Sequence, residues 1–111
     1  NNMFLIDNET NTMTIVKKDT ASFDVSLENY VLEEGDTVTF TVAKEVEQEQ
    51  PVIQVIVTEF NSGIARVRLT SADTNIEVGD YKYDVQVNTA DGRVDTIVGP
   101  AKFKVIGGVT Y

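Results

Sequence analysis

The chain contains 111 residues with no cysteine and no histidine, and 18 acidic residues against 9 basic ones give a formal net charge of −9. This length predicts one domain, residues 1–111, whose core needs no disulfide or metal to be stable. The negative field repels phosphate backbones and anionic lipids, and no apolar run is long enough to span a bilayer, so we expect no nucleic-acid partner and no membrane partner.

Apolar and polar residues alternate along most of the sequence, and this period of two predicts strands with one buried and one exposed face. Residues 2–16 predict two short strands joined by a polar turn at 7–11. The strands expected after these cover residues 21–27, 37–43, 51–60, 64–69, 81–87, 93–98 and 101–105. Residues 43–51 contain a single apolar side chain between Lys44 and Gln50, so we expect a solvated loop there. The pattern is typical of an all-β sandwich or barrel of about eight or nine short antiparallel strands.

A pair of tyrosines begins the strand expected at 81–87, in the stretch EVGDYKY. In immunoglobulin-type sandwiches an acidic residue, a small residue and a tyrosine recur at this spacing, with a cysteine two residues after the tyrosine. Glu77, Gly79 and Tyr81 match the first three positions, and Tyr83 stands in place of the cysteine. We expect Tyr81 to be buried with its hydroxyl bonded back to the backbone, and Tyr83 to fill the volume of the absent disulfide. The predicted fold is therefore an immunoglobulin-like Greek-key β-sandwich.

Catalytic chemistry finds little support in the sequence. Without histidine, a nucleophilic enzyme would need lysine or a carboxylate as its base, and the lysines fall at polar positions or on the exposed faces of predicted strands. Acidic residues scattered over the loops of a small sandwich are typical solvating groups rather than the paired carboxylates of a glycosidase. We therefore expect no enzymatic activity.

Calcium is a better chemical alternative, because the loops LEEGD and DGRVD supply hard oxygen ligands where sandwich domains bind this ion. The candidate ligands are Glu33, Glu34, Asp36, Asp91 and Asp95. Neither loop has the spacing of an EF-hand. Turns with Gly35 and Gly92 supplying the bend explain both loops without a metal, so we expect no cofactor.

The edges of the predicted sheets are the remaining feature that could take part in binding. An unprotected edge strand can pair with a strand of another protein, and natural edges are often protected by lysine. Lys102 and Lys104 on the last strand fit such protection, although the outer face of an inner strand would give the same pattern.

Three stretches together are similar to a known group of proteins, and they are KKDTASFDVSLENYVLEEGDTVTFTV at 17–42, SADTNIEVGDYKYDVQV at 71–87 and DGRVDTIVGPAKFKVIGGVT at 91–110. They resemble the immunoglobulin-like module of tail and baseplate proteins of phages that infect Gram-positive bacteria, in particular the N-terminal domain of the upper baseplate protein. The shared features are an early GDT, a GxYxYD stretch, a DG hairpin and a closing FxV. The resemblance covers most of residues 15–110, and Lys18 departs from it at a position where glycine is common.

This resemblance implies a non-enzymatic virion component, assembled in the host cytoplasm and located in the tail or baseplate of a phage or prophage. It implies other tail and baseplate proteins as partners, with homo-oligomers in the assembled particle, and no catalytic residues. Two alternatives stay open. One is an immunoglobulin-like cell-surface or adhesin module of a bacterium, with calcium as a ligand. The other is a carbohydrate-binding domain, against which the polar outer faces of the predicted strands argue.

Overall fold

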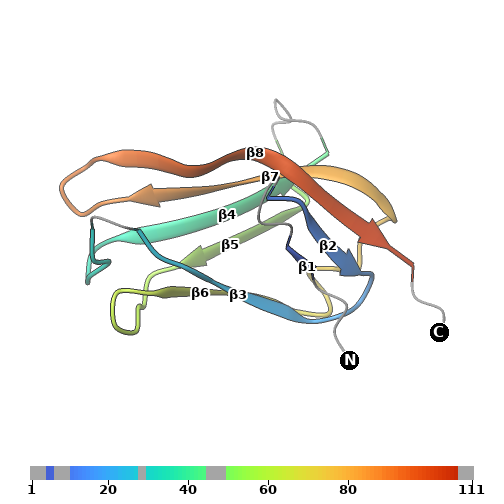
Figure 1. The fold of residues 1–111 in the computed structure, drawn as a ribbon, viewed down its shortest axis with the longest axis horizontal. Helices are drawn as coiled ribbons and strands as arrows, with labels where there is room; N and C mark the ends of the chain where they lie inside the picture. Colours follow the sequence, from blue (N-terminus) through green and yellow to red (C-terminus); the bar gives the residue numbers. More distant parts are fainter. Residues whose placement is uncertain (1–4, 7–10, 28–29, 45–49, 108–111) are drawn as a thin grey trace.

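The structure is a computed structural model that describes residues 5–6, 11–27, 30–44 and 50–107. Over these ranges the chain forms strands and no helix, which confirms the all-β prediction (Figure 1). The strands are β1 (Leu5–Ile6), β2 (Met13–Val16), β3 (Ala21–Val25), β4 (Thr37–Ala43), β5 (Ile53–Val57), β6 (Ala65–Leu69), β7 (Gly79–Asn88) and β8 (Val94–Ile106). Most of the polar turn predicted at 7–11 and of the loop predicted at 43–51 lies outside the described residues.

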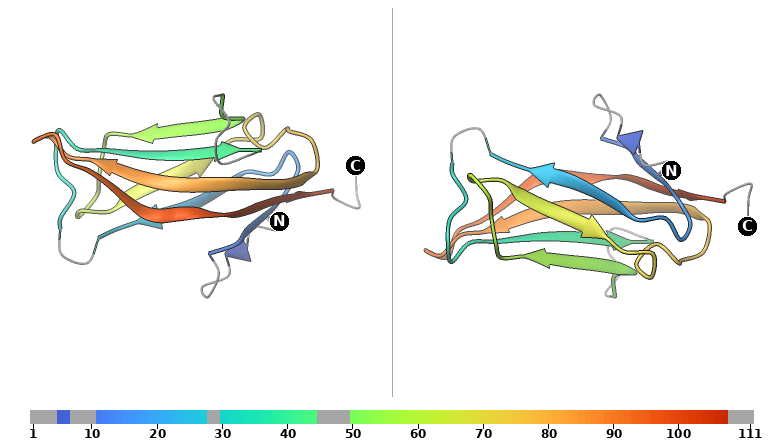
Figure 2. Two further views of the ribbon diagram at one scale, coloured as in Figure 1. Left: turned by 90° about the horizontal axis from the view of Figure 1, so that it is seen from above. Right: turned by 90° about the horizontal axis from the view of Figure 1, so that it is seen from below.

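Two sheets of unequal width form the sandwich. The larger sheet has the strand order β1-β2-β8-β7-β4-β5, and the smaller one consists of β3 and β6 alone. Figure 2 shows this pair lying across one face of the larger sheet. The chain changes sheet between β2 and β3, between β3 and β4, between β5 and β6, and again between β6 and β7. The predicted β-sandwich is confirmed, and its immunoglobulin-like form stays a prediction.

Aromatic side chains join the two sheets in the core. Phe23 on β3 and Phe40 on β4 meet edge to face with ring centroids 5.2 Å apart, a geometry that aromatic pairs favour. The Phe40 ring also lies 5.5 Å from Tyr83 and 6.1 Å from Phe103. Phe40 and Phe103 are fully buried, as alternation predicted for the inward face of each strand.

One strand pair departs from the antiparallel prediction. β2 runs parallel to β8, with Met13 opposite Phe103 and Ile15 opposite Val105. Because alternation fixes only which side of a strand is buried, it says nothing about the direction of the neighbouring strand. The prediction of purely antiparallel strands was therefore wrong at this edge of the larger sheet.

The last two predicted strands, at 93–98 and 101–105, are a single strand, β8, of 13 residues. Pro100 lies within it, and the β7–β8 register shifts where Tyr83 and Val85 pair with Ala101 and Val98. Proline has no N–H to donate to the ladder and is tolerated in strands at such irregularities. The Gly-Pro sequence therefore marks a local shift in the pairing rather than the end of the strand.

β8 is also not an edge strand, because it lies between β2 and β7. Lys102 and Lys104 are exposed on its outer face, opposite Lys82 and Asp80 of β7. The interpretation of these two lysines as edge protection was therefore wrong, and their alternation reflects an inner strand with one face in solvent.

Candidate functional site

Tyr81 makes the contact that its spacing predicts. The side chain is 6% exposed, and its hydroxyl donates a hydrogen bond of 2.5 Å to the carbonyl oxygen of Glu77, four residues earlier. Burial raises the pKa of this phenol, and the charge of Glu77 raises it further. Tyr81 thus holds the entry to β7 and has no exposed face on which a sugar could stack.

Tyr83 fills the core, as expected for the residue that replaces the cysteine. It is 3% exposed, and its ring packs against Phe40 and Phe103. Its hydroxyl donates to the carbonyl oxygen of Asn11, just before β2, and burial raises its pKa. The sequence did not predict the hydrogen bond from Tyr83 to Asn11, which connects β7 to a residue 72 positions earlier in the chain.

Gly92 and Gly79 differ in their backbone conformation and in the part of the fold that they serve. Gly92 has φ of +95° in the turn of the β7–β8 hairpin, and its N–H donates to the carbonyl oxygen of Thr89, 3.0 Å away, as the predicted turn needs. Gly79 begins β7 with φ of +158°, a value that residues with a side chain rarely adopt, although an added Cβ there would meet no atom within 4 Å. The surroundings of Gly79 are therefore not crowded.

Asp36, a calcium candidate, is instead bonded to hydrogen-bond donors of the protein. It is 1% exposed. Its carboxylate accepts bonds from the Glu33 N–H at 3.0 Å, the Tyr30 hydroxyl at 2.8 Å and the Ala90 N–H at 3.0 Å. The Glu33 N–H contributes most to holding the pKa of Asp36 below its ordinary value, with help from the other two donors. A carboxylate surrounded in this way stabilises loops and is poorly placed to bind a cation.

The other calcium candidates do not gather around an ion position either. Asp91 accepts from the Thr89 hydroxyl, which contributes most to lowering the pKa of this acid. Asp95 pairs with Arg93 at 3.0 Å. Glu33 and Glu34 are exposed. Within the described ranges, no three acidic side chains lie close enough together to hold a metal, and no buried side-chain polar atom lacks a hydrogen-bond partner.

These contacts join two connections at one end of the sandwich. Gly35 has φ of +98°, and a Cβ placed there would lie 2.9 Å from the Cβ of Ala90, so the backbone of the β3–β4 connection approaches the hairpin turn closely. The Arg93 guanidinium lies 5.8 Å from the centre of the Tyr30 ring. The bond to Asp36 raises the pKa of Tyr30 to about 12. The acidic loops are therefore structural, and Tyr30, which the sequence left unassigned, is part of that arrangement.

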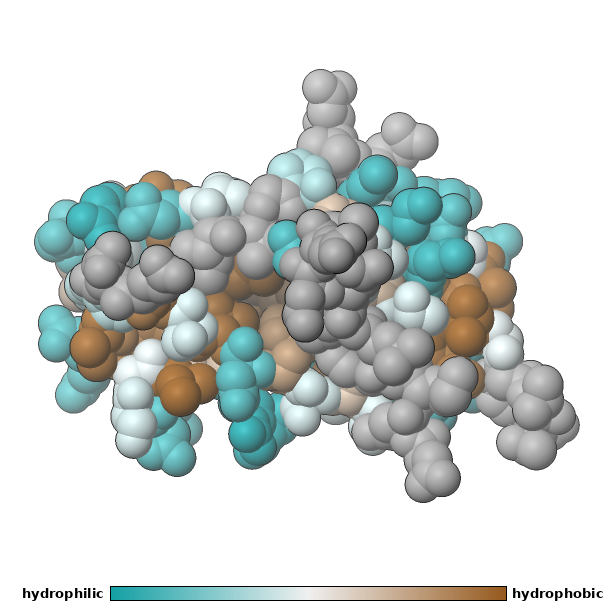
Figure 3. Space-filling view, viewed as in Figure 1, coloured by the Kyte–Doolittle hydropathy of each residue, from teal (hydrophilic) through white to brown (hydrophobic). Residues whose placement is uncertain are grey.

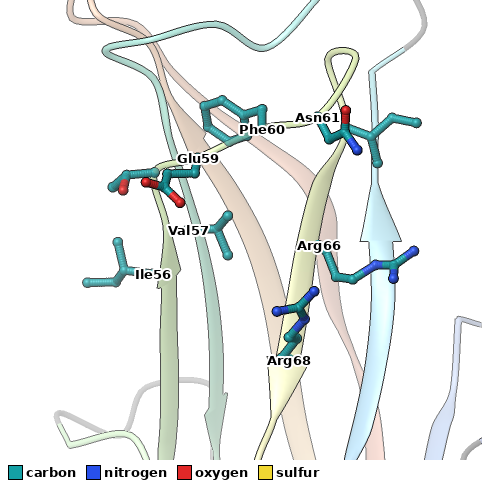
Figure 4. A pocket seen from close by; sticks show the side chains of 9 residues that line it. Ile56, Val57, Glu59, Phe60, Asn61, Arg66 and Arg68 are labelled. Atoms are coloured by element: carbon teal, nitrogen blue, oxygen red, sulfur yellow. The ribbon is translucent and has the colours of Figure 1, made fainter.

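A groove opens on the side of the sandwich where β5 and β6 face each other, and we name it the β5–β6 groove. It has a volume of about 470 Å³. Its lining consists of Ile56, Val57, Thr58, Glu59, Phe60, Asn61, Ile64, Arg66 and Arg68. Figure 4 shows Val57 turned toward the space between the strands and Ile56 turned away from it. Figure 3 shows apolar surface among hydrophilic side chains at the lower left, where Figure 1 places the end of β5 and the start of β6.

The two arginines of the groove differ in their partners. Arg66 pairs with Asp24 on β3 at 2.9 Å, and this bond lowers the pKa of Asp24 and raises that of Arg66. Arg68 faces Ser22 across the β3–β6 ladder, and its guanidinium has no ion pair or hydrogen bond with any described residue. In a chain of net charge −9, Arg68 is therefore an exposed cation that is free to bind an external anion.

No protein-family model matches this chain, and no curated protein matches it. Solved structures do match. A candidate glycoside hydrolase from Bacteroides vulgatus is 13% identical over 87% of this chain, with a TM-score of 0.50. The extracellular domain of a candidate one-component system from B. thetaiotaomicron is 17% identical over 88%, also with a TM-score of 0.50. The chain spans 17% and 12% of the lengths of these two proteins, so the likeness concerns a small part of each and shows the fold alone.

Proposed function

We propose that this chain is a non-enzymatic module that acts through protein–protein contacts as a structural component of a phage or prophage tail or baseplate. The observation that carries the proposal is the open side of the sandwich, where β5 and β6 each have only one strand neighbour among the described residues. A free edge beside a partly apolar groove is a surface to which another protein can add.

The chemistry of the chain supports binding rather than catalysis. Asp24, Asp36 and Asp91 have lowered pKa values because each accepts hydrogen bonds that belong to the fold. Tyr30, Tyr81 and the other shifted groups described above are likewise explained by structural partners or by burial. Perturbed groups that face a cleft are the usual sign of a catalytic site, and these groups act on the loops and core instead.

The location in a virion rests on the resemblance of residues 15–110 to tail and baseplate modules. The partners would then be other tail or baseplate proteins and further copies of the chain, and assembly would take place in the host cytoplasm. The two solved neighbours include this fold as a small part of a longer chain, which agrees with a module that positions other parts of an assembly.

Electron microscopy with gold-labelled antibody tests this proposal. The label is applied to particles released after prophage induction and to uninduced cells of the same strain. We expect gold on tails or tail tips. Label confined to the envelopes of uninduced cells would overturn the virion location and favour the cell-surface module instead.

A further inference from the structure

The smaller sheet ends before it has covered the larger one. On β4, Val38 and Phe40 are fully buried under β3 and β6, whereas their partners on β5, Val57 and Val55, are only half-buried. These four side chains belong to the same inward face of one sheet. The loss of burial from β4 to β5 therefore marks where a third strand of the smaller sheet would lie.

Apolar side chains that a third strand would cover are already in place. Val55, Val57 and Phe60 are partly buried against the core, and Ile64 is 38% exposed beside them. An extended segment paired with the free edge of β6 would direct every second side chain inward over these residues. Apolar side chains at those positions would remove the remaining surface of β5 from water.

The outward positions of such a segment would lie beside the arginines. Arg66 and Arg68 alternate with the buried residues of β6 and point to its outer face. Asp24 on β3 already pairs with Arg66, while Arg68 faces Ser22 and its guanidinium is unpaired among the described residues. Opposite charges in cross-strand neighbours stabilise a sheet, so an acidic residue on the added strand would pair with Arg68 as Asp24 pairs with Arg66.

The same charges argue against a second copy of this chain as the occupant. Two β6 strands paired edge to edge in antiparallel register would bring arginine opposite arginine, and like charges at directly opposite positions are destabilising. Charged side chains on an edge strand also discourage pairing with neutral strands. The edge therefore selects for a negatively charged partner.

From these observations we infer that the free edge of β6 accepts an extended segment of another protein, in which apolar residues alternate with aspartate or glutamate. The segment adds a third strand to the smaller sheet, covers Val55 and Val57, and places a carboxylate beside Arg68. This inference rests on the proposed function, since it states the chemistry by which the module would hold a neighbouring protein.

Selection from a random peptide display library on the whole chain tests this inference. We expect enriched peptides that alternate apolar and acidic residues, and we expect a synthetic peptide of that sequence to perturb backbone amide NMR signals of β6. Arg68→Glu should weaken binding of this peptide by about 5–10-fold, and a peptide with lysine in place of its acidic residues should bind that variant better than the native chain. Lys102→Glu, on the outer face of β8, is the matched control and should leave the affinity unchanged.

Three results would overturn the inference. They are the absence of enriched peptides, enrichment of peptides without acidic residues, and perturbation confined to β5 or to strands outside the groove. Each result is read from the purified chain, independently of where gold label is found. Peptide binding with no label on particles would therefore refute the virion location and keep the β6 edge as an acceptor. Labelled tails without peptide binding would support the virion location and refute the β6 edge as an acceptor.

Discussion

The carboxylate of Asp36 accepts a hydrogen bond of 3.0 Å from the backbone N–H of Ala90, 54 residues later in the chain. This bond joins the connection before β4 to the turn between β7 and β8. The Tyr30 hydroxyl and the Glu33 N–H donate to the same carboxylate, so one buried side chain joins the β3–β4 connection to the β7–β8 turn at this end of the sandwich. The hydrogen bonds of Asp36 therefore hold these two connections together.

Asp36→Asn should lower the thermal stability of the protein. The amide presents an NH₂ group to donors that now face an oxygen, so at least one buried donor loses its partner. We expect the melting temperature to fall by about 5 °C or more in a circular dichroism melt. Glu34→Gln, an exposed change two residues away, is the control and should melt like the native chain. Equal melting temperatures for the two variants would refute the structural role of Asp36.

The free energy of unfolding should decrease in acid because the Asp36 carboxylate becomes protonated. The pKa of Asp36 is lower in the folded chain than in the unfolded one, so the folded state resists protonation. The contribution of Asp36 is therefore complete above the ordinary aspartate pKa of about 4 and is lost as the pH falls through the lower folded value. Urea unfolding between pH 2 and 7 measures this decline. Asp36→Asn should flatten it, and an unchanged decline in that variant would assign the acid sensitivity to other carboxylates such as Asp24 and Asp91.

Asp84 should behave in the opposite way, because burial raises its pKa in the folded chain. The charged form is disfavoured by folding, so the penalty appears as the pH rises above the ordinary aspartate value and is absent in acid. We expect Asp84→Asn to raise the urea midpoint at pH 7, with a gain that disappears at low pH. Asp80→Asn, at a more exposed position on the same face of β7, is the matched control and should give no comparable gain.

Tyr81→Phe should destabilise the fold by roughly 1–3 kcal/mol, because it leaves the Glu77 carbonyl without its donor while preserving the ring. Equilibrium unfolding in urea measures the loss. Tyr83→Phe should cost a similar amount, since it frees the Asn11 carbonyl in the same way. A negligible loss for Tyr81→Phe would mean that the hydroxyl bond at the start of β7 does not stabilise the fold.

Features set by local sequence were predicted well. The period of two places alternate side chains on one face of a strand whatever its neighbours are, so one buried face on each strand was predicted correctly, and Phe40, Val67 and Phe103 lie on such faces. A bond from the Tyr81 hydroxyl back to the backbone was also predicted, and the acceptor in the structure, the Glu77 carbonyl oxygen, lies only four residues earlier. Gly92 was assigned to its turn for the same reason.

Relationships between distant parts of the chain were not predicted. The parallel pairing of β2 with β8, the contact of Tyr83 with Asn11, and the bond between Asp36 and Ala90 all depend on which segments meet in space. The acidic loops left calcium open as an alternative, because their spacing does not reveal the hydrogen-bond donors that face Asp36 and Asp91. The β5–β6 groove was missed as well, since a narrow second sheet leaves no local signal in the sequence.

Amide hydrogen–deuterium exchange of the protein in its native assembly, compared with the isolated chain, tests the central claim most directly. The account predicts slower exchange in the assembly for the backbone amides on the free edge of β6, which have no strand neighbour among the described residues. Amides that line the β5–β6 groove should slow with them. Protection confined to the outer face of β7 and β8, around Lys82 and Lys102, with β6 exchanging as fast as in the isolated chain, would contradict it.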